Sequence, residues 1–561
     1  MSFHRKAPLA GTDRQAPRPE ARRHALRLLP GLAGILAAAA FPDLGRGDLA
    51  WVALTPLVYF VARVGSPVRI FSGVWLGGIV QYLGILYWIP GTLVRYGSLP
   101  LAASWGLFLL MAALLASFQA AACVATRSCM NRRGAPCLLL FAPAWVAAEY
   151  LRSSFPFGGF PWMLLGYSQT DSLRLIQVAD ITGVWGISLL ITWVNTALVW
   201  VLLNRRRLAS LAPLAGGLAG IAASAAYGSA SLRHWDAIQP DRRAAMLQGN
   251  LSVDEPDSSL RWKYLEGYLE MADQLAPGEI DLLLLPESPS PILYQHDRGY
   301  REALSRLARR FPLGMVLNNV FFSEAGGSSE YFNSAFFLDK AGQLAGRYDK
   351  VHLVPFGEYV PLQTVFFFSR AITRDVGNFH PGSDYPVVPL DGHPANAIIC
   401  FEAVFPDLSR EFVLRGSQLI INLTNDGWYG DTAAPYQHLA MARWRAIESR
   451  RFLLRAANSG ISAVVAPSGR IQVRTGLLRR ETAVGSFAFL PGMTFYARHG
   501  GFCRNACVII LCLALLWSLA TRQPGKPAGV ASWIREDGML EELREKVRAI
   551  EQKVEQVRGY L

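Results

Sequence analysis

Hydrophobic positions divide the chain into two kinds of sequence. Residues 28–232 consist of long apolar runs with few charges, and one more such run lies at 503–521. Between them, residues 240–490 contain short apolar runs that alternate with amphipathic stretches and polar turns. Because a membrane-spanning helix needs about 20 apolar residues, the long runs predict spans. The alternating pattern of residues 240–490 predicts an α/β domain.

We expect a helical membrane bundle of about eight spans. Seven runs precede the polar region and one follows it, at 28–41, 49–62, 70–90, 99–125, 136–151, 175–203, 208–231 and 503–521. The first, second and fifth runs are short for a span. The pattern therefore predicts membrane helices of unequal length.

Basic residues are concentrated in every second connection between these runs. They are Arg63 and Arg69 in the second connection, Arg127, Arg132 and Arg133 in the fourth, and Arg205, Arg206 and Arg207 in the sixth. Residues 1–27 are also basic and lack the pattern of a removable signal peptide. Since Lys and Arg accumulate in cytoplasmic connections, we expect residues 1–27 to be a cytoplasmic tail. Residues 240–490 are then expected on the outer face of the membrane.

Within the polar region, the pattern predicts strands interleaved with helices. Strands are expected at 244–248, 281–286, 313–322, 331–338, 396–400, 418–423 and 461–466, and helices at 258–275, 298–310, 407–415 and 435–455. Buried strands interleaved with amphipathic helices indicate helices packed over sheet.

The composition agrees with a membrane protein that carries a polar domain. The 561 residues are 52% hydrophobic and 17% charged, whereas about a quarter of the residues in soluble domains are charged. The net charge is +13, but the arginines are scattered between apolar runs. We interpret them as a topology signal and expect no nucleic-acid partner.

Residues 535–561 form a separate segment with a heptad pattern. Apolar residues between 540 and 561 are spaced alternately by three and four, with charged residues between them. This spacing predicts a helix with one apolar seam. Two interpretations stay open: an amphipathic helix on the protein or membrane, or a coiled coil with a partner or a second copy.

One of the seven cysteines, Cys400, lies in the polar region. It follows the apolar residues 397–399, where we expect a buried strand to end. No Cys-x-x-Cys pair is present, which disfavours a zinc site and thioredoxin-type redox chemistry. We expect no metal and no cofactor. The alternative to a reactive thiol is a buried structural cysteine.

Two further reactive groups lie in the same region. Glu287 follows four leucines and a proline, and Lys350 lies in the stretch Arg-Tyr-Asp-Lys-Val-His. A carboxylate whose pKa is raised by burial can accept the proton of a thiol such as Cys400. A lysine can favour the thiolate and stabilise an oxyanion. Acid, lysine and thiol together predict nucleophilic acyl-transfer chemistry.

The order Glu287, Lys350, Cys400 resembles the catalytic set of the nitrilase superfamily, whose members fold as an α-β-β-α sandwich. Longer motifs are similar to those of the apolipoprotein N-acyltransferase family. They are HLVPFGEYVP at 352–361, NDGWYG at 425–430, Gln437-His438, and Met441-Ala-Arg443 with the arginine-rich stretch that follows it to 455. The resemblance covers roughly residues 25–520.

The resemblance implies a role for each member of the set: Cys400 as nucleophile, Glu287 as general base and Lys350 as the stabiliser of negative charge. Other matching positions are Glu358 and Glu402 as supporting acids, and Trp262 and Trp428 near a lipid entrance. At position 401 the chain has Phe401, where we expect a tyrosine in some family members.

The resemblance also implies a reaction and a location. Cys400 would take an acyl chain from a membrane phospholipid as a thioester and pass it to the α-amino group of a lipoprotein's N-terminal diacylglyceryl-cysteine. The expected partners are membrane lipids, the phospholipid acyl donor and the diacylglyceryl-lipoprotein acceptor. The expected location is the bacterial inner membrane, with the catalytic domain facing the periplasm.

Three alternatives remain at this point. One is a membrane-tethered amidase or nitrile hydrolase that uses the same three groups on a soluble substrate. Another is a catalytically silent scaffold that recruits a partner through the heptad segment. The third is a Cys-His hydrolase, for which the available histidines are His352, His380, His393 and His438.

Overall fold

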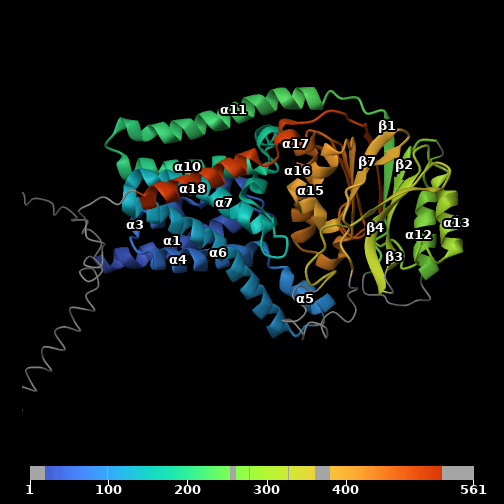
Figure 1. The fold of residues 1–561 in the computed structure, drawn as a ribbon, viewed down its shortest axis with the longest axis horizontal. Coiled ribbons are helices and arrows are strands. Elements are labelled where there is room, and N and C mark those ends of the chain that lie inside the picture. Colours follow the sequence, from blue (N-terminus) through green and yellow to red (C-terminus); the bar gives the residue numbers. More distant parts are fainter. Residues whose placement is uncertain are drawn as a thin grey trace, which may run out of the picture. The chain divides into compact units, whose positions relative to one another are not determined.

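The computed structural model describes residues 19–97, 99–252, 261–276, 278–325, 328–359 and 379–520. The predicted heptad helix at 535–561 and most of the basic tail at 1–27 lie outside these ranges. A compact unit extends to Leu511, and a second begins at Cys512. The membrane bundle that precedes the α/β domain belongs to the first unit together with that domain (Figure 1).

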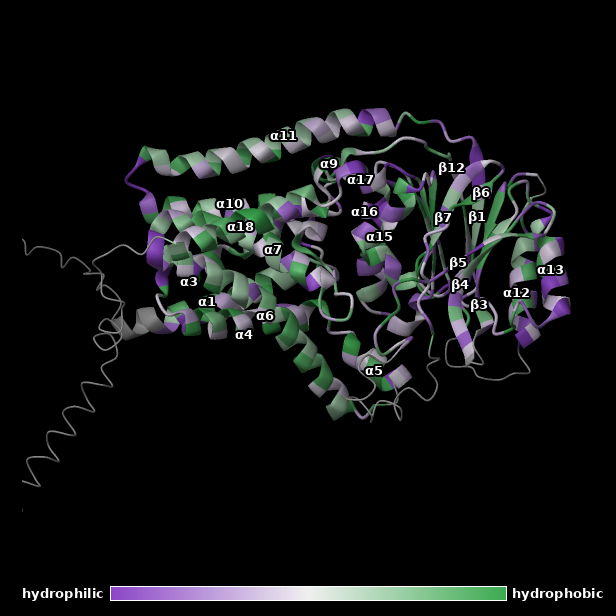
Figure 2. Cartoon of the chain, in the orientation of Figure 1, coloured by the Kyte–Doolittle hydropathy of each residue, from purple (hydrophilic) through white to green (hydrophobic). Residues whose placement is uncertain are grey.

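The predicted membrane bundle is confirmed as a set of apolar helices. Its helices are α1 (Pro19–Ala39), α2 (Ala50–Ala53), α3 (Thr55–Arg63), α4 (Pro67–Ile85), α5 (Ile89–Gly97), α6 (Leu101–Arg133), α7 (Phe141–Ser154), α8 (Leu173–Ile176), α9 (Ala179–Thr182), α10 (Val184–Asn204), α11 (Ala212–Trp235) and, after the α/β domain, α18 (Phe502–Ala520). Among the described residues, five helices are long and apolar enough to span a membrane: α4, α6, α10, α11 with its preceding turn, and α18. Figure 2 shows hydrophobic residues along these helices.

Two of the three short predicted runs form broken helices. Residues 49–62 become α2 and α3, and residues 136–151 become a 3-10 turn followed by α7. The helix α7 has 14 residues and is mostly buried. A buried helix of this length packs inside the bundle and is shorter than a span.

The second and fourth connections between the predicted runs lie at one end of the bundle, and the first and third lie at the other. The Arg127 guanidinium in the fourth connection donates to the carbonyls of Val61 (3.3 Å) and Ala62 (2.9 Å), at the start of the second. At the other end, the Gln437 side chain of the α/β domain donates to the carbonyls of Pro42 (2.9 Å) and Ile85 (3.0 Å). The basic connections therefore lie away from the α/β domain.

The α/β domain contains two six-stranded sheets. One has the order β12-β1-β2-β3-β4-β5, and the other β11-β10-β9-β8-β7-β6. The strands are β1 (Arg242–Gln248), β2 (Leu282–Leu284), β3 (Met315–Ala325), β4 (Ser328–Leu338), β5 (Leu344–Asp349), β6 (Val388–Leu390), β7 (His393–Ile399), β8 (Leu419–Thr424), β9 (Leu453–Ala457), β10 (Ala463–Val465), β11 (Ile471–Arg474) and β12 (Glu481–Phe487).

Helices cover the outer face of each sheet, which confirms the α-β-β-α sandwich. On one side lie α12 (Arg261–Asp273) and α13 (Arg298–Ala308), and on the other α15 (Pro406–Leu414) and α16 (Ala434–Ser449), as Figure 1 shows. Alternate residues of β1 face the two cores: Ala244 and Met246 join the core between the sheets, whereas Ala245 and Leu247 join that under α12 and α13. The period of two is that of a strand buried on both faces.

Two predictions of local structure are wrong. The strand predicted at 396–400 ends at Ile399, and Cys400 begins the 3-10 helix Cys400–Val404. The helix predicted at 435–455 ends at Ser449, because Arg450 adopts a left-handed conformation (φ 52°). Residues 453–457 are then the buried strand β9, which pairs with β8 and β10.

The end of α16 joins the α/β domain to the bundle. The buried Arg450 guanidinium donates to the Asp180 carboxylate (2.7 Å) and to the Gln177 side chain (2.6 Å). In the last turn of the helix, the Glu448 carboxylate accepts from the backbone N–H of Val184 (3.2 Å). Removal of one partner from a buried ion pair strongly destabilises a protein. These contacts therefore hold the α/β domain and the bundle in one arrangement.

Candidate active site

Cys400 occupies a sharp turn at the carboxyl end of β7. Its φ of 50° is in the left-handed region, which a residue with a side chain rarely adopts. The carbonyl of Cys400 accepts a hydrogen bond from Nε2 of His438 (3.0 Å), which holds the turn in place. Strain held by surrounding contacts is typical of functional positions. The turn places a buried thiol at the edge where parallel strands β7, β8 and β9 end.

Glu287 lies near this thiol, on the opposite sheet. It follows β2, and its charge adds to the effect of burial in raising the pKa of Cys400. One carboxyl oxygen accepts from the Asn333 side chain (3.0 Å) and the other from the backbone N–H of Asn425 (2.9 Å). Burial raises the pKa of Glu287 and the pKa of Cys400. The thiol is therefore neutral at rest, beside a carboxylate suited to accept its proton.

Lys350 is buried against two carboxylates. It follows β5, and its Nζ lies 2.9 Å from Oε1 of Glu358 and 3.7 Å from Oε1 of Glu287. Burial disfavours the ammonium, but Glu358 and Glu287 outweigh it and raise the pKa of Lys350. The lysine stays charged at neutral pH, so it can stabilise negative charge that develops at Cys400.

Asn333 and Glu358 complete this cluster. The Asn333 amide donates to Glu358 (2.7 Å) as well as to Glu287, so it bridges the two carboxylates. Glu358 also accepts from the backbone N–H of Val354 (2.8 Å). Sequence analysis missed Asn333. Its only signal there was a polar residue within a predicted strand, at 331–338.

Glu402 joins the loop of Lys350 to the turn of Cys400. One of its oxygens accepts from the backbone N–H groups of Val351 (2.9 Å) and His352 (3.0 Å) and from the Tyr348 hydroxyl (2.6 Å). Its other oxygen accepts from the backbone N–H of Ile399 (2.7 Å). Burial raises the pKa of Glu402 to about 7. All four donors come from the protein, so this acid positions the site.

His438 supports the nucleophile by a hydrogen bond to the backbone carbonyl of Cys400. Its Nδ1 lies 2.9 Å from the Asp426 carboxylate, which in turn pairs with the Arg455 guanidinium (2.7 Å). Burial and the nearby Arg455 lower the pKa of His438. With Nε2 donating to the Cys400 carbonyl, neither ring nitrogen is left for the thiol. Sequence analysis did not assign this network, whose members come from β9, α16 and the turn after β8.

The other three histidines have different surroundings. The ring of His352 packs at 3.7 Å from that of Phe405, and burial lowers its pKa to about 4. His393 stacks on Phe489 at the start of β7, the end away from Cys400. His380 bonds through its backbone to β4. These surroundings, together with the bonds made by both ring nitrogens of His438, disfavour the Cys-His alternative.

Aromatic rings from both domains meet beside the nucleophile. Trp162, from the connection after α7, stacks on Phe401 (6.3 Å, 18°), and Trp88, from the connection after α4, packs edge-on against Tyr429 (4.9 Å). The pKa of Tyr429 is raised by burial and by the charge of Cys400. The membrane bundle thus contributes part of the wall around the site. Phe401 is part of this wall and lacks the hydroxyl that a tyrosine at this position would have.

The two predicted entrance tryptophans lie in different places. Trp428 is partly exposed and packs on Tyr96 of α5 (4.7 Å), and its carbonyl accepts from Thr92 (3.2 Å). It therefore lies where the bundle meets the α/β domain. Trp262 is partly exposed at the start of α12 and lies against Gly299 of α13. Within the described part of the chain, Trp262 therefore packs on α13 and not on the cluster of Glu287, Lys350 and Cys400.

Comparisons with known proteins agree with this arrangement. Residues 33–197 match the family "Apolipoprotein N-acyltransferase N-terminal domain", and residues 243–488 match "Carbon-nitrogen hydrolase". The apolipoprotein N-acyltransferase of Geobacter metallireducens is 36% identical over 86% of this chain and 93% of its own length. That of Methylococcus capsulatus is 32% identical over 89% of this chain and 98% of its own length.

Solved structures of the nitrilase superfamily are also similar. Nit3 of Saccharomyces cerevisiae matches 45% of this chain and 91% of its own, with 19% identity and a TM-score of 0.35. The two full-length relatives and the two matched families carry the assignment. The chain belongs to the apolipoprotein N-acyltransferase family.

Proposed function

We propose that this protein transfers an acyl chain from a membrane phospholipid to the N-terminal diacylglyceryl-cysteine of lipoproteins, through a thioester on Cys400. The observation that carries the proposal is the buried cluster of acid, lysine and thiol, in which Nζ of Lys350 lies 3.7 Å from Glu287 and the charges of both groups act on the buried Cys400. The family of the chain supplies the class of substrate. No step needs a metal or a cofactor.

The first half-reaction forms the acyl-enzyme. The Cys400 thiol gives its proton to Glu287 as sulfur attacks the ester carbonyl of the phospholipid. Negative charge develops on the carbonyl oxygen, and Lys350 stabilises it without losing its proton. Collapse of this intermediate breaks the ester bond. The leaving lysophospholipid takes the proton from Glu287, and a thioester remains on Cys400.

The second half-reaction consumes the thioester. The free α-amino group of the lipoprotein attacks the thioester carbonyl, and Glu287 accepts a proton from the nitrogen. The amide forms as the bond to sulfur breaks, and the proton returns to the Cys400 sulfur. The rings of Trp162, Phe401 and Tyr429 limit access of water, which would otherwise hydrolyse the thioester.

The contacts between the two domains support a reaction on membrane-anchored substrates. Trp88 and Trp162 of the bundle lie beside the nucleophile, and Trp428 of the α/β domain packs on α5. Both lipid substrates reside in one bilayer, so a site next to the spans can receive each in turn. The protein is a bacterial membrane protein. We place it in the inner membrane with residues 242–487 in the periplasm, because the basic connections lie at the opposite end of the bundle.

A membrane-tethered amidase is less well supported. The same three groups would serve it, but residues 33–197 would then have no role in the reaction, although the bundle supplies Trp88 and Trp162 to the site. The silent scaffold is disfavoured by the intact set of acid, lysine and thiol.

The test is acyl transfer by the full-length protein in phospholipid vesicles that contain a diacylglyceryl lipopeptide. We expect the wild type to add one acyl chain to the lipopeptide, as seen by mass spectrometry, and Cys400→Ser to add none. The matched control is Cys512→Ser, at an exposed cysteine in α18, which should transfer normally. Transfer by Cys400→Ser at the wild-type rate would overturn the mechanism, and release of fatty acid without transfer would favour the hydrolase.

A further inference from the structure

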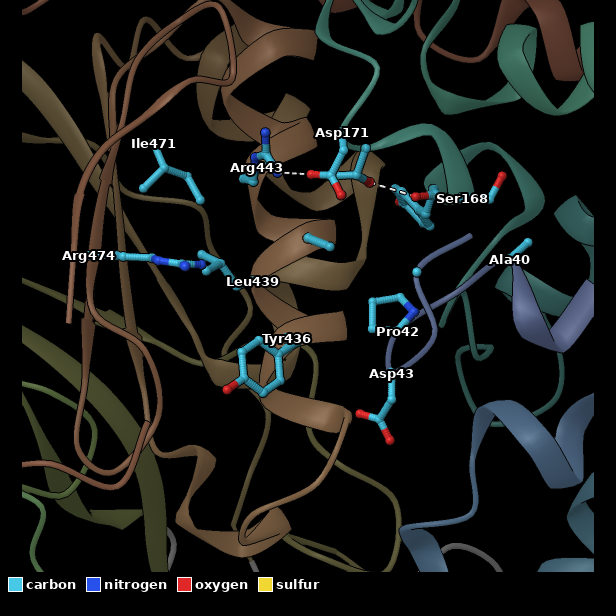
Figure 3. A pocket seen from close by; sticks show the side chains of 14 residues that line it. Ala40, Pro42, Asp43, Ser168, Asp171, Tyr436, Leu439, Arg443, Ile471 and Arg474 are labelled. Atoms are coloured by element: carbon cyan, nitrogen blue, oxygen red, sulfur yellow. Dashed lines mark hydrogen bonds and ion pairs between the residues drawn. The ribbon is translucent and has the colours of Figure 1, made fainter. Parts of the chain in front are cut away.

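A second cavity lies on the other side of α16 from the nucleophile. Its volume is about 410 Å³. Its lining comes from α16, from β11, and from the connections after α1 and α7, and includes Tyr436, Leu439, Arg443, Arg474, Asp43 and Asp171 (Figure 3). Glu287, Lys350 and Cys400 are not part of this lining. The cavity is therefore separate from the proposed reaction.

The helix α16 presents different faces to the two sites. Tyr436, Leu439 and Arg443 recur at helical spacing and line the cavity. His438, on another face, donates to the Cys400 carbonyl. One rigid helix thus forms a wall of both sites.

Two arginines point into this cavity from opposite sides. The Arg443 side chain is only 11% exposed, and it bonds to the Asp171 carboxylate (3.1 Å) and to the Gly469 carbonyl (3.0 Å). Figure 3 shows Arg474 extending from β11 toward Leu439 on α16. Among the described residues, Arg474 has no ion pair and no side-chain hydrogen bond. Burial lowers the pKa of Arg443, the contact with Asp171 raises it, and the nearby charge of Arg474 lowers it, so the two guanidinium groups are close enough to share one anion.

Carboxylates occupy the other parts of the lining. Asp171 is almost fully exposed apart from its contact with Arg443. Asp43 accepts a hydrogen bond from the Tyr87 hydroxyl (2.6 Å). An anion between the arginines would relieve their repulsion, and an ammonium would find a partner in Asp43 or Asp171. A ligand with a phosphate and an amine matches the charges of both signs.

The position of the cavity favours a lipid over a soluble ligand. Ala40 lines it directly after α1, whose residues Leu28, Leu32 and Ile35 are exposed along the helix. Leu44, between the lining residues Asp43 and Gly45, is 71% exposed. Apolar residues that are exposed on a membrane bundle face the lipid. Acyl chains can therefore lie beside the bundle while the headgroup enters the cavity.

We propose that this cavity holds the headgroup of a zwitterionic glycerophospholipid as an accessory lipid, separate from the acyl donor. The phosphate binds between Arg443 and Arg474, and the ammonium faces Asp43 and Asp171. The bound lipid joins α16 to the connections after α1 and α7. This proposal concerns a binding site and does not depend on the acyl transfer proposed above.

The test uses the full-length protein carrying Cys400→Ala, so that the probe is not consumed. The probe is a phosphatidylethanolamine with a diazirine on the first carbons of one acyl chain, and adducts are located by peptide mass spectrometry. We expect adducts in peptides that cover residues 36–47 and 434–443. Arg474→Glu should reduce them about tenfold. Arg306→Glu, an equal charge change on the exposed face of α13, should leave them unchanged.

Three outcomes would overturn the assignment. They are the absence of adducts from these peptides, labelling of Arg474→Glu at the wild-type level, and loss of labelling when inorganic phosphate is added at the same concentration as the lipid. Equal labelling by a phosphatidylglycerol probe would contradict the role of the ammonium. With Cys400 restored, Arg474→Glu should still form the acyl-enzyme, so failure of this site is distinguished from failure of the proposed reaction.

Discussion

Replacement of Lys350 by methionine tests how the buried ammonium affects the pKa of Glu287 and the rate of acylation. Lys350→Met keeps the length of the side chain and removes its charge. At the observed 3.7 Å between Nζ and Glu287, two unit charges attract by about 4 kcal/mol at an effective dielectric constant of about 20. Without the ammonium, the pKa of Glu287 rises further, since Lys350 is the group that lowers it most. The base is then protonated over a wider range of pH.

Two changes in acyl-enzyme formation are expected from Lys350→Met. The rate at neutral pH should fall about a hundredfold or more, as when one oxyanion donor is removed. The acid limb of the pH–rate profile should move to higher pH, because a base with a raised pKa loses its proton only at higher pH. Single-turnover acylation of Cys400, measured by mass spectrometry between acid and alkaline pH, gives both values.

The control for this experiment is Lys340→Met, at a lysine that is 70% exposed. It should leave the rate and the pH profile unchanged. Thermal unfolding of both variants separates loss of fold from loss of chemistry. A folded Lys350→Met protein that acylates Cys400 at the wild-type rate, with its acid limb unmoved, would refute the role of Lys350.

Three other predictions follow from the same contacts. Glu402→Gln must turn its NH₂ toward a backbone N–H, so we expect a loss of stability of about 1–3 kcal/mol and slower acylation, whereas Glu266→Gln, at an exposed acid of α12, should lose neither; unchanged thermal unfolding would contradict this. Trp428→Ala removes a ring at the junction with α5, so KM for phospholipid should rise more than kcat falls; a loss confined to kcat would argue against an entrance role. In a background without reactive native thiols, an impermeant reagent outside the membrane should label Ser329→Cys and spare Leu208→Cys, which is 88% exposed directly after the sixth connection; the reverse would contradict the orientation.

The sequence indicated the three reactive groups because each lies at or near the end of an apolar run. Parallel strands bring their carboxyl ends to one edge of a sheet, so Cys400 after β7 was expected to face into a site. That its backbone is left-handed was not expected, since only tertiary contacts such as that from His438 can hold such a conformation. Glu402 illustrates the same limit: its spacing from Cys400 was visible, but three of its four donors come from residues 348–352, about 50 residues earlier in the chain.

The misassigned segment at 450–455 shows why long-range pairing escapes a pattern. The sequence pattern predicted that Arg450, Arg451 and Arg455 form the polar face of a continuing helix. In the structure all three are buried, and Arg450 and Arg455 pair with Asp180 and Asp426. Charged residues are buried only where such partners exist. Periodicity alone carries no information about partners more than 200 residues away, such as Asp180.

The central claim is that Cys400 carries the acyl chain between the two substrates. The direct measurement is intact-protein and peptide mass spectrometry of the wild type after incubation with phospholipid and no acceptor. The account predicts one added acyl group on the peptide that contains Cys400, which disappears when a diacylglyceryl lipopeptide is added and reappears on its amino group. An unmodified Cys400 in a preparation that still acylates the lipopeptide would contradict the account.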